Sequence, residues 1–235
     1  MPLPRPKAVL FDLFHTLVCT PPTGGEFGPP MGDTLGIPHL HRELMRRFHD
    51  DDVLNRCLGH VRDPLDIIRR LARSLDPTIS EDRIAMALAD RRRRMEHCLV
   101  NVEPDILDAL DRLRRAGIKT ALVSDAGVDD VEYWPHSPLV ERFDCVVFSY
   151  ELGIRKPDRR IYDRALSSIG MPPADAVFVG DGGSDEHRGA RALGLGTVLV
   201  TRLIAKWRPE CVQERRPHAD WEFQDVLAFV DAIAL

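Results

Sequence analysis

Short apolar runs rich in β-forming residues recur along the chain, and each ends in a polar turn. The first run ends at Phe11, and later runs occupy residues 119–123, 146–148, 176–179 and 197–200. Segments with the i, i+3, i+4 apolar spacing of helices lie between them, at residues 104–116, 160–169 and 186–193, and a last one spans 223–233. Parallel strands need crossover helices that cover both faces of the sheet. The alternation therefore predicts an α/β fold with a doubly wound parallel sheet.

Residues 39–100 follow a different pattern, with apolar positions at helical spacing and no predicted strand. Leu40, Leu44 and Phe48 share one helical face. Ser80 predicts a helix start, because a hydroxyl oxygen followed by two acidic residues satisfies free N–H groups and the helix dipole. Residues 21–33 are rich in Pro and Gly, so we expect a loop there that cannot hold a regular helix.

This organisation predicts two domains. Residues 1–20 and 101–235 are expected to form the α/β core, and residues 21–100 an all-helical cap domain inserted directly after the first strand. A lid at that place can exclude water from a bound substrate and contact it.

Composition and charge narrow the function classes. The chain has 44% hydrophobic and 29% charged residues and a net charge of -5, which provides no general basic field for nucleic acid. The four arginines at 91–94 are expected on the solvated face of an amphipathic helix. Five widely spaced cysteines fit reduced thiols rather than a zinc site. With no predicted signal peptide or membrane span, the expected location is cytoplasmic.

Polar residues stand at the ends of several predicted strands. Asp12 follows the first run, Ser124 the second and Asp181 a later one, while Lys156 lies in an Arg-Lys-Pro-Asp turn. The strand ends of an open α/β sheet form its ligand crevice, so these groups are expected to converge. Asp12 is the predicted nucleophile, because a carboxylate can form a covalent aspartyl intermediate that water then hydrolyses. Lys156 can neutralise the charge that gathers around it.

A magnesium site is predicted at the same place. Two carboxylates from neighbouring strand tips, Asp12 and Asp181, together with the backbone carbonyl of Phe14, make an oxygen-rich set. Magnesium prefers such ligands and also takes a phosphate oxygen of the substrate. The predicted cofactor is therefore Mg²⁺.

The order and chemistry of these segments resemble the haloacid dehalogenase superfamily of aspartate-nucleophile hydrolases. The resemblance implies a helical cap between the first and second motifs and a Ser124 hydroxyl that bonds a phosphoryl oxygen. It also implies a further acidic group four or five residues beyond Asp181, and both Asp185 and Glu186 fit that spacing. Asp125, a predicted phosphate-site residue beside Ser124, stands where the family often has asparagine.

One position departs from the family pattern. Most phosphatases of the superfamily carry a second aspartate two residues after the nucleophile, which protonates the leaving group, and here that residue is Phe14. Acid–base assistance contributes about 10²–10⁴-fold to such reactions. His15 is a candidate substitute because its ordinary pKa is near neutrality, and His187 is a weaker one.

Three functions are consistent with these sequence features. The favoured one is a magnesium-dependent phosphatase of a small phosphorylated metabolite. An aromatic residue at Phe14 also resembles the metal-independent 2-haloacid dehalogenase branch, although that branch lacks the acidic residue found here at Asp181. A degenerate member kept for binding or regulation is the third hypothesis.

Overall fold

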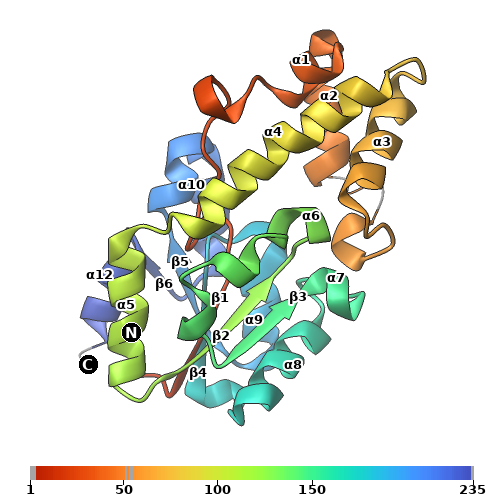
Figure 1. Cartoon of the computed structure of the whole chain (residues 1–235). Coiled ribbons are helices and arrows are strands. Elements are labelled where there is room, and N and C mark those ends of the chain that lie inside the picture. Colours follow the sequence, from red (N-terminus) through yellow and green to blue (C-terminus); the bar gives the residue numbers. More distant parts are fainter. Residues whose placement is uncertain (1–3, 51, 53–54, 234–235) are drawn as a thin grey trace.

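The sheet at the centre of the molecule is parallel throughout, and its first strand lies in the middle (Figure 1). The computed structural model describes residues 4–50, 52 and 55–233. Its strand order is β3-β2-β1-β4-β5-β6. The strands are β1 (Ala8–Phe11), β2 (Lys119–Ser124), β3 (Cys145–Phe148), β4 (Ala176–Gly180), β5 (Gly196–Val200) and β6 (Trp221–Phe223). The predicted α/β class with a doubly wound parallel sheet is confirmed.

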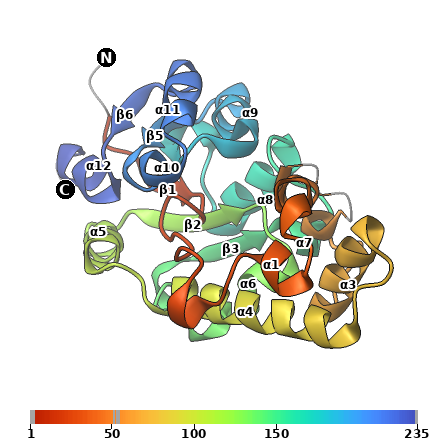
Figure 2. The same ribbon diagram turned by 90° about the horizontal axis from the view of Figure 1, so that it is seen from above.

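Alternate residues of β1 pack into two different apolar cores. Val9 and Phe11 face α5 (Pro104–Arg115) and α12 (Val226–Ala232). Ala8 and Leu10 face α8 (Arg159–Ile169) and α9 (Glu186–Leu193), on the opposite side of the sheet (Figure 2). A strand covered on both faces needs apolar residues at every position, which explains its unbroken apolar run.

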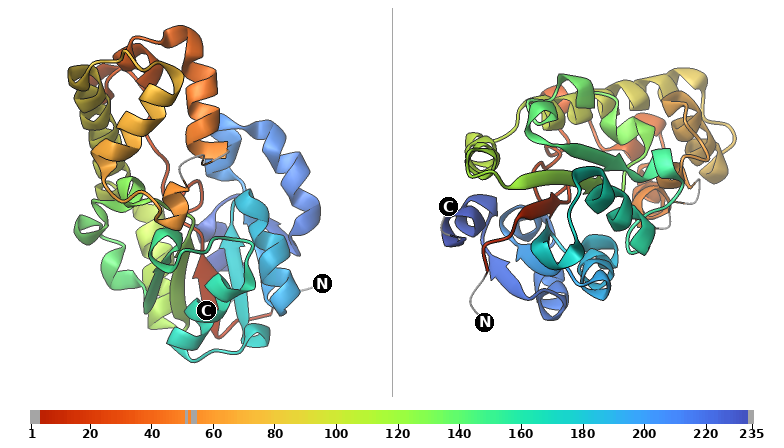
Figure 3. Two further views of the ribbon diagram at one scale, coloured as in Figure 1. Left: turned by 90° about the vertical axis from the view of Figure 1, so that its right-hand side faces the viewer. Right: turned by 90° about the horizontal axis from the view of Figure 1, so that it is seen from below.

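The segment between β1 and α5 is helical and lies beyond the ends to which the strands point (Figures 1 and 3). Residues such as Leu44, Ile68 and Leu88 form an apolar cluster of their own there. No described residue between β1 and β2 belongs to a regular strand. The helices are η1 (Gly25–Phe27), α1 (Met31–Leu35), η2 (Pro38–Leu40), α2 (His41–Met45), η3 (Arg46–Asp50), η4 (Arg56–Leu58), α3 (Pro64–Leu75) and α4 (Glu81–Val100).

Two local predictions in this segment have different outcomes. Ser80 does begin α4, where its Oγ accepts a hydrogen bond from the backbone N–H of Arg83 at 3.5 Å. The prediction that residues 21–33 hold no regular helix is wrong, because α1 begins at Met31. Pro30 is the residue before the first turn of α1, where its missing N–H costs no hydrogen bond.

The C-terminal region holds elements that the apolar pattern did not predict. Helices α10 (Arg202–Trp207) and α11 (Pro209–Arg215) follow β5, and the edge strand β6 has only three residues. The last helix begins at Val226 rather than at 223, because the side chain of Asp225 caps it by accepting from the N–H of Ala228 at 2.8 Å.

The remaining short helices are α6 (Val128–Val131), η5 (Trp134–His136), η6 (Val140–Arg142), α7 (Ser149–Leu152), η7 (Pro173–Asp175), η8 (Gly183–Asp185) and η9 (Arg216–His218).

Among the described residues, none of the helices combines the length and apolar character needed to cross a bilayer.

Candidate active site

Asp12 extends the central strand β1 by one residue. Its backbone N–H donates to the carbonyl of Val179 in β4 at 2.9 Å, and the residue is 6% exposed. The Oγ1 of Thr16 donates to Oδ2 at 3.1 Å, and Lys156 Nζ lies 2.5 Å from Oδ1. Burial raises the pKa of Asp12, and the nearby Lys156 ammonium partly offsets that rise. The nucleophile predicted from sequence is therefore fixed through both of its oxygens.

Lys156 is a buried cation held between two carboxylates. Its Nζ bonds Asp12 and also Glu186 Oε2, the latter at 2.6 Å, and it lies 5.6 Å from the centre of the Phe178 ring. Burial alone would lower its pKa, but the charges of Asp12 and Glu186 hold the pKa of Lys156 well above its usual range. The side chain is therefore positively charged and ordered at neutral pH.

Three carboxylates converge at the ends of β1 and β4. Asp12, Asp181 and Glu186 are all buried, and one oxygen from each lies within 4.8 Å of the others. Glu186 Oε1 accepts from the N–H of Gly182 at 2.7 Å. A side chain at Gly180 would collide with that carboxylate, since an added Cβ would stand 2.1 Å from Glu186 Oε1.

Asp185 and Glu186, the two acidic residues that the sequence left open, lie in different surroundings. Asp185 has a φ of 52°, and its side chain is 60% exposed and lies 3.6 Å from Arg188. It points away from Asp12 and Asp181, whereas Glu186 joins them. The carbonyl of Phe14 remains a predicted ligand, on a loop residue that bridges to Val18.

Arg215 contacts this cluster and was missed by the sequence analysis. Its Nη1 lies 2.6 Å from Asp181 Oδ2 and donates to the Asp181 carbonyl at 3.0 Å. The stem of Arg215 fills the space beside Gly182, where an added Cβ would lie 2.9–3.1 Å from it. Arg215 ends a helix that the apolar pattern did not predict. The glycines after Asp181 were the one sequence signal that another segment packs closely there.

Ser124 and Asp125 lie at the end of β2, beside the tip of β1. The Ser124 hydroxyl is fully buried and has no hydrogen-bond partner within the described chain. Asp125 Oδ1 accepts from the backbone N–H of Lys156 at 2.9 Å. A buried polar atom without a partner is rare in folded proteins and often marks the place of a ligand.

The two histidines considered as proton donors lie in different surroundings. His15 is half-buried with a φ of 61°, and its Nδ1 stands 3.6 Å from Cys19 Sγ. His187 is buried with Nε2 3.1 Å from the carbonyl of Val198 in β5, and burial lowers its pKa to about 4. Phe14 packs its ring against the apolar core on the α5 side.

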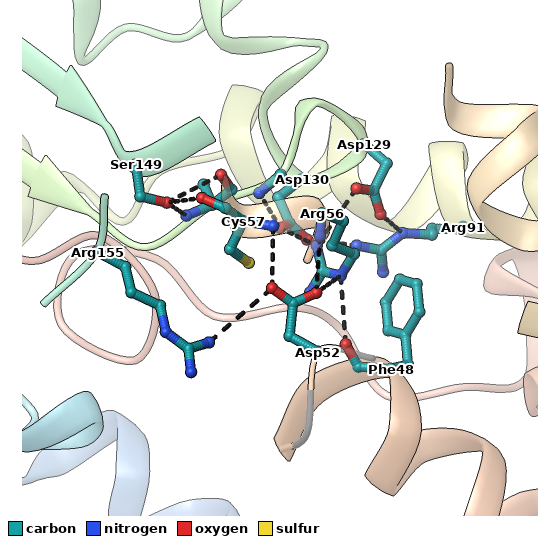
Figure 4. A network of polar contacts seen from close by, with 11 residues as sticks. Phe48, Asp52, Arg56, Cys57, Arg91, Asp129, Asp130, Ser149 and Arg155 are labelled. Carbon is teal, nitrogen blue, oxygen red and sulfur yellow. Dashed lines mark hydrogen bonds and ion pairs between the residues drawn. The ribbon is translucent and has the colours of Figure 1, made fainter. Parts of the chain in front are cut away.

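A buried network of charges joins the helical segment to α6, the short helix that follows β2 (Figure 4). Arg91 Nε donates to Asp129 Oδ2 at 2.8 Å and Arg56 Nη1 to Asp129 Oδ1 at 3.3 Å, and both guanidiniums also bond Asp130. Asp130 Oδ2 accepts from the N–H of Gly127 at 2.8 Å. These contacts anchor the chain that follows Ser124 to two helices of the segment between β1 and β2.

The arginine run at 91–94 is therefore only partly solvated. Arg91 and Arg94 are 5% and 8% exposed, and Arg94 Nη1 donates to the carbonyl of Phe27 at 2.8 Å. Arg92 instead forms a surface pair with Glu132. The prediction of a solvated face fails because α4 packs against α6, whose aspartates supply partners for a buried cation.

Comparisons with known proteins agree with this architecture. Residues 6–194 match the family described as haloacid dehalogenase-like hydrolase. A phosphoserine phosphatase of Thermus thermophilus is 36% identical over 115 residues, which cover 48% of this chain and 46% of that enzyme. A glyceraldehyde 3-phosphate phosphatase of Methanopyrus kandleri is 35% identical over 206 residues, covering 83% of this chain and 84% of that enzyme. The structure of L-2-haloacid dehalogenase from Xanthobacter autotrophicus shares the fold, with a TM-score of 0.61, 18% identity and coverage of 97% and 98%.

Proposed function

The chain belongs to the haloacid dehalogenase-like hydrolase family, and we propose that it is a magnesium-dependent phosphatase of a small phosphorylated metabolite. The observation that carries this proposal is the group of three buried carboxylates, Asp12, Asp181 and Glu186, within 4.8 Å of one another. Lys156 and the unpartnered Ser124 hydroxyl stand beside them. The longer of the two phosphatase matches, which covers most of both chains, supports the same reaction class.

The donor atoms fit magnesium, since all three side chains offer oxygen and magnesium prefers oxygen ligands. Asp12, Asp181, Glu186 and the Phe14 carbonyl are the residues that would hold it. Bound there, magnesium supplies positive charge to the phosphoryl oxygens. In the protein alone, Lys156 pairs with Asp12 and Arg215 pairs with Asp181, so Arg215 would have to yield Asp181 Oδ2 for that oxygen to hold a metal.

Side chains of the protein carry out the other steps of the proposed reaction. Asp12 attacks phosphorus and forms an aspartyl phosphate, while the Lys156 ammonium neutralises the carboxylate and the transferring group. The Ser124 hydroxyl donates to a phosphoryl oxygen and so gains the partner it lacks. Water then hydrolyses the aspartyl phosphate and regenerates Asp12.

We assign the role of a cap to residues 21–100. Their own apolar cluster and their place beyond the strand ends support a unit that covers Asp12. A covered site excludes bulk water from the reacting groups and suits a small substrate.

A metal-independent 2-haloacid dehalogenase is the second candidate. The aromatic residue at Phe14 favours it, and so does the shared fold. The buried Asp181 argues against it, because the family resemblance gives that branch no acidic residue at this position. A binding protein without turnover is the remaining possibility.

Phosphate release from aryl, acyl, sugar and nucleoside phosphates, with Mg²⁺ or with a chelator, tests the proposal. We expect release that requires Mg²⁺. Halide release from 2-haloacids in chelator, without phosphate release, would instead establish the dehalogenase. If the protein releases neither phosphate nor halide, binding remains as its function.

Glu186→Gln and Asp185→Asn form a matched pair of variants. We expect Glu186→Gln to lower the rate of phosphate release or the Mg²⁺ affinity by about 10–100-fold, the usual cost of disturbing a metal site. Asp185→Asn should leave both unchanged, since its side chain faces solvent. Steady-state rates across a Mg²⁺ titration give both quantities. The reverse ranking would show that Asp185 serves the metal.

A further inference from the structure

The proposed phosphatase reaction needs a proton donor that Phe14 cannot provide. An alkoxide is a poor leaving group, so its oxygen must be protonated as the ester bond to phosphorus breaks. His187 is engaged with the carbonyl of Val198 in β5, and His15 is turned toward Cys19. Burial lowers the pKa of His187 to about 4, which leaves its ring neutral at neutral pH, and in the described chain neither ring hydrogen-bonds Asp12, Ser124 or Lys156. We therefore consider another donor.

Asp125 lies beside the proposed phosphate site. It follows Ser124 at the end of β2, the strand that pairs with β1. Lys156 links it to the nucleophile, because the backbone N–H of Lys156 donates to Asp125 Oδ1 at 2.9 Å while its Nζ lies 2.5 Å from Asp12 Oδ1. Asp125 and Asp12 therefore lie at the two ends of one lysine residue.

The second oxygen of Asp125 lacks a closely bonded partner in the described chain, and the Ser184 hydroxyl lies near this carboxyl. Oδ2 is buried and has no hydrogen-bond partner within the described chain, and the same is true of the adjacent Ser124 hydroxyl. Two consecutive residues at a strand tip thus carry buried polar atoms without partners. Unsatisfied buried groups are costly, so their occurrence side by side indicates that a bound molecule completes them.

The surroundings of Asp125 favour its protonated form. Burial raises the pKa of this carboxyl, and the effect outweighs the opposing influence of Lys156, the Ser184 hydroxyl and Arg155. The neutral carboxyl can keep Oδ1 as acceptor for the Lys156 N–H and carry its proton on Oδ2. A general acid needs this combination of a fixed position and an available proton.

We propose that Asp125 is the general acid and base of the reaction, in place of the aspartate that Phe14 replaces; this role rests on the proposed phosphatase function. As Asp12 bonds to phosphorus and the ester bond breaks, Asp125 gives its proton to the departing oxygen, which leaves as an alcohol. Asp125 is then a carboxylate. It takes a proton from the water that attacks the aspartyl phosphate, and the release of phosphate restores Asp12 and protonated Asp125.

Asp125→Asn tests this role with little change in shape. The amide oxygen can still accept from the Lys156 N–H, so only the transferable proton is removed. The measured quantity is the ratio of kcat/KM for an alkyl phosphate, such as glycerol phosphate, to that for 4-nitrophenyl phosphate. Because 4-nitrophenolate leaves without protonation, we expect the ratio to fall by about 10²-fold or more in Asp125→Asn. Both rates come from one preparation, so a reduced folded fraction cancels.

Ser124→Ala is the matched control at the neighbouring residue. Its hydroxyl would contact the phosphoryl group, which all substrates share, so its loss should slow both substrates equally and leave the ratio unchanged. An unchanged ratio in Asp125→Asn would overturn the acid–base role while leaving the phosphatase function intact. If the wild-type chain releases phosphate from no member of the panel of aryl, acyl, sugar and nucleoside phosphates, the proposed function fails, and the acid–base role of Asp125 fails with it.

Discussion

Replacing Asp12 by asparagine is expected to lower phosphate release by roughly 10⁴–10⁶-fold, the range found when a nucleophilic unit is removed. The amide is a far weaker nucleophile than the carboxylate. The substitution also removes a negative charge from the group that would hold the metal. Steady-state rates measured with an aryl phosphate in Mg²⁺ give the loss, and acid quenching with labelled substrate shows whether a phosphorylated protein forms.

Asp175→Asn is the control for this variant. Asp175 lies just before β4, at the end of the sheet opposite to Asp12, and forms a surface pair with Lys7. Its replacement should leave the rate and the labelling unchanged. Substantial turnover in Asp12→Asn, or a labelled intermediate in that variant, would exclude Asp12 as the nucleophile.

Arg91→Met is expected to lower the free energy of unfolding by about 3–5 kcal/mol, the cost of removing one partner from a buried ion pair. Methionine can fill much of the space, but among the described residues it leaves Arg56 as the one cation paired with the buried carboxylates of Asp129 and Asp130. Urea unfolding followed by circular dichroism measures the difference. Because these contacts join α4 to α6, the variant also tests whether the helical segment depends on them.

Arg92→Met makes the same substitution one residue away. Arg92 pairs with Glu132 at the surface, where such pairs contribute about 0–1 kcal/mol. A loss in Arg91→Met no larger than in Arg92→Met would show that the buried network does not stabilise the fold.

Lowering the pH should remove the difference in the free energy of unfolding between wild type and Arg91→Met. Burial alone would raise the pKa of Asp130, but the guanidiniums of Arg56 and Arg91 lower it from 3.8 to about 2. A carboxylate whose pKa is lower in the folded state stabilises the fold above its unfolded pKa, and that contribution disappears as pH falls through the folded value. The two proteins should therefore converge in stability between pH 4 and 2.

The sequence by itself determined five strands of the sheet, the family and the residues at the strand tips. A strand buried on both faces is apolar at every position and ends where the polarity changes, so the strand through Phe11 and the position of Asp12 follow from local pattern. The family resemblance drawn from the order of Asp12, Ser124, Lys156 and Asp181 is confirmed by the match over residues 6–194. The roles of these residues and the domain boundaries at 20 and 100 remain predictions.

Tertiary structure alone decided the directions and partners of side chains. Ser184 and Asp185 both have positive φ values, which turn Asp185 outward and Glu186 inward, and spacing along the chain does not encode that turn. Arg91 is buried and Arg215 reaches Asp181 because segments far apart in sequence meet in space. A charged side chain is buried only where a distant element supplies its counter-charge, and that supply depends on the whole fold.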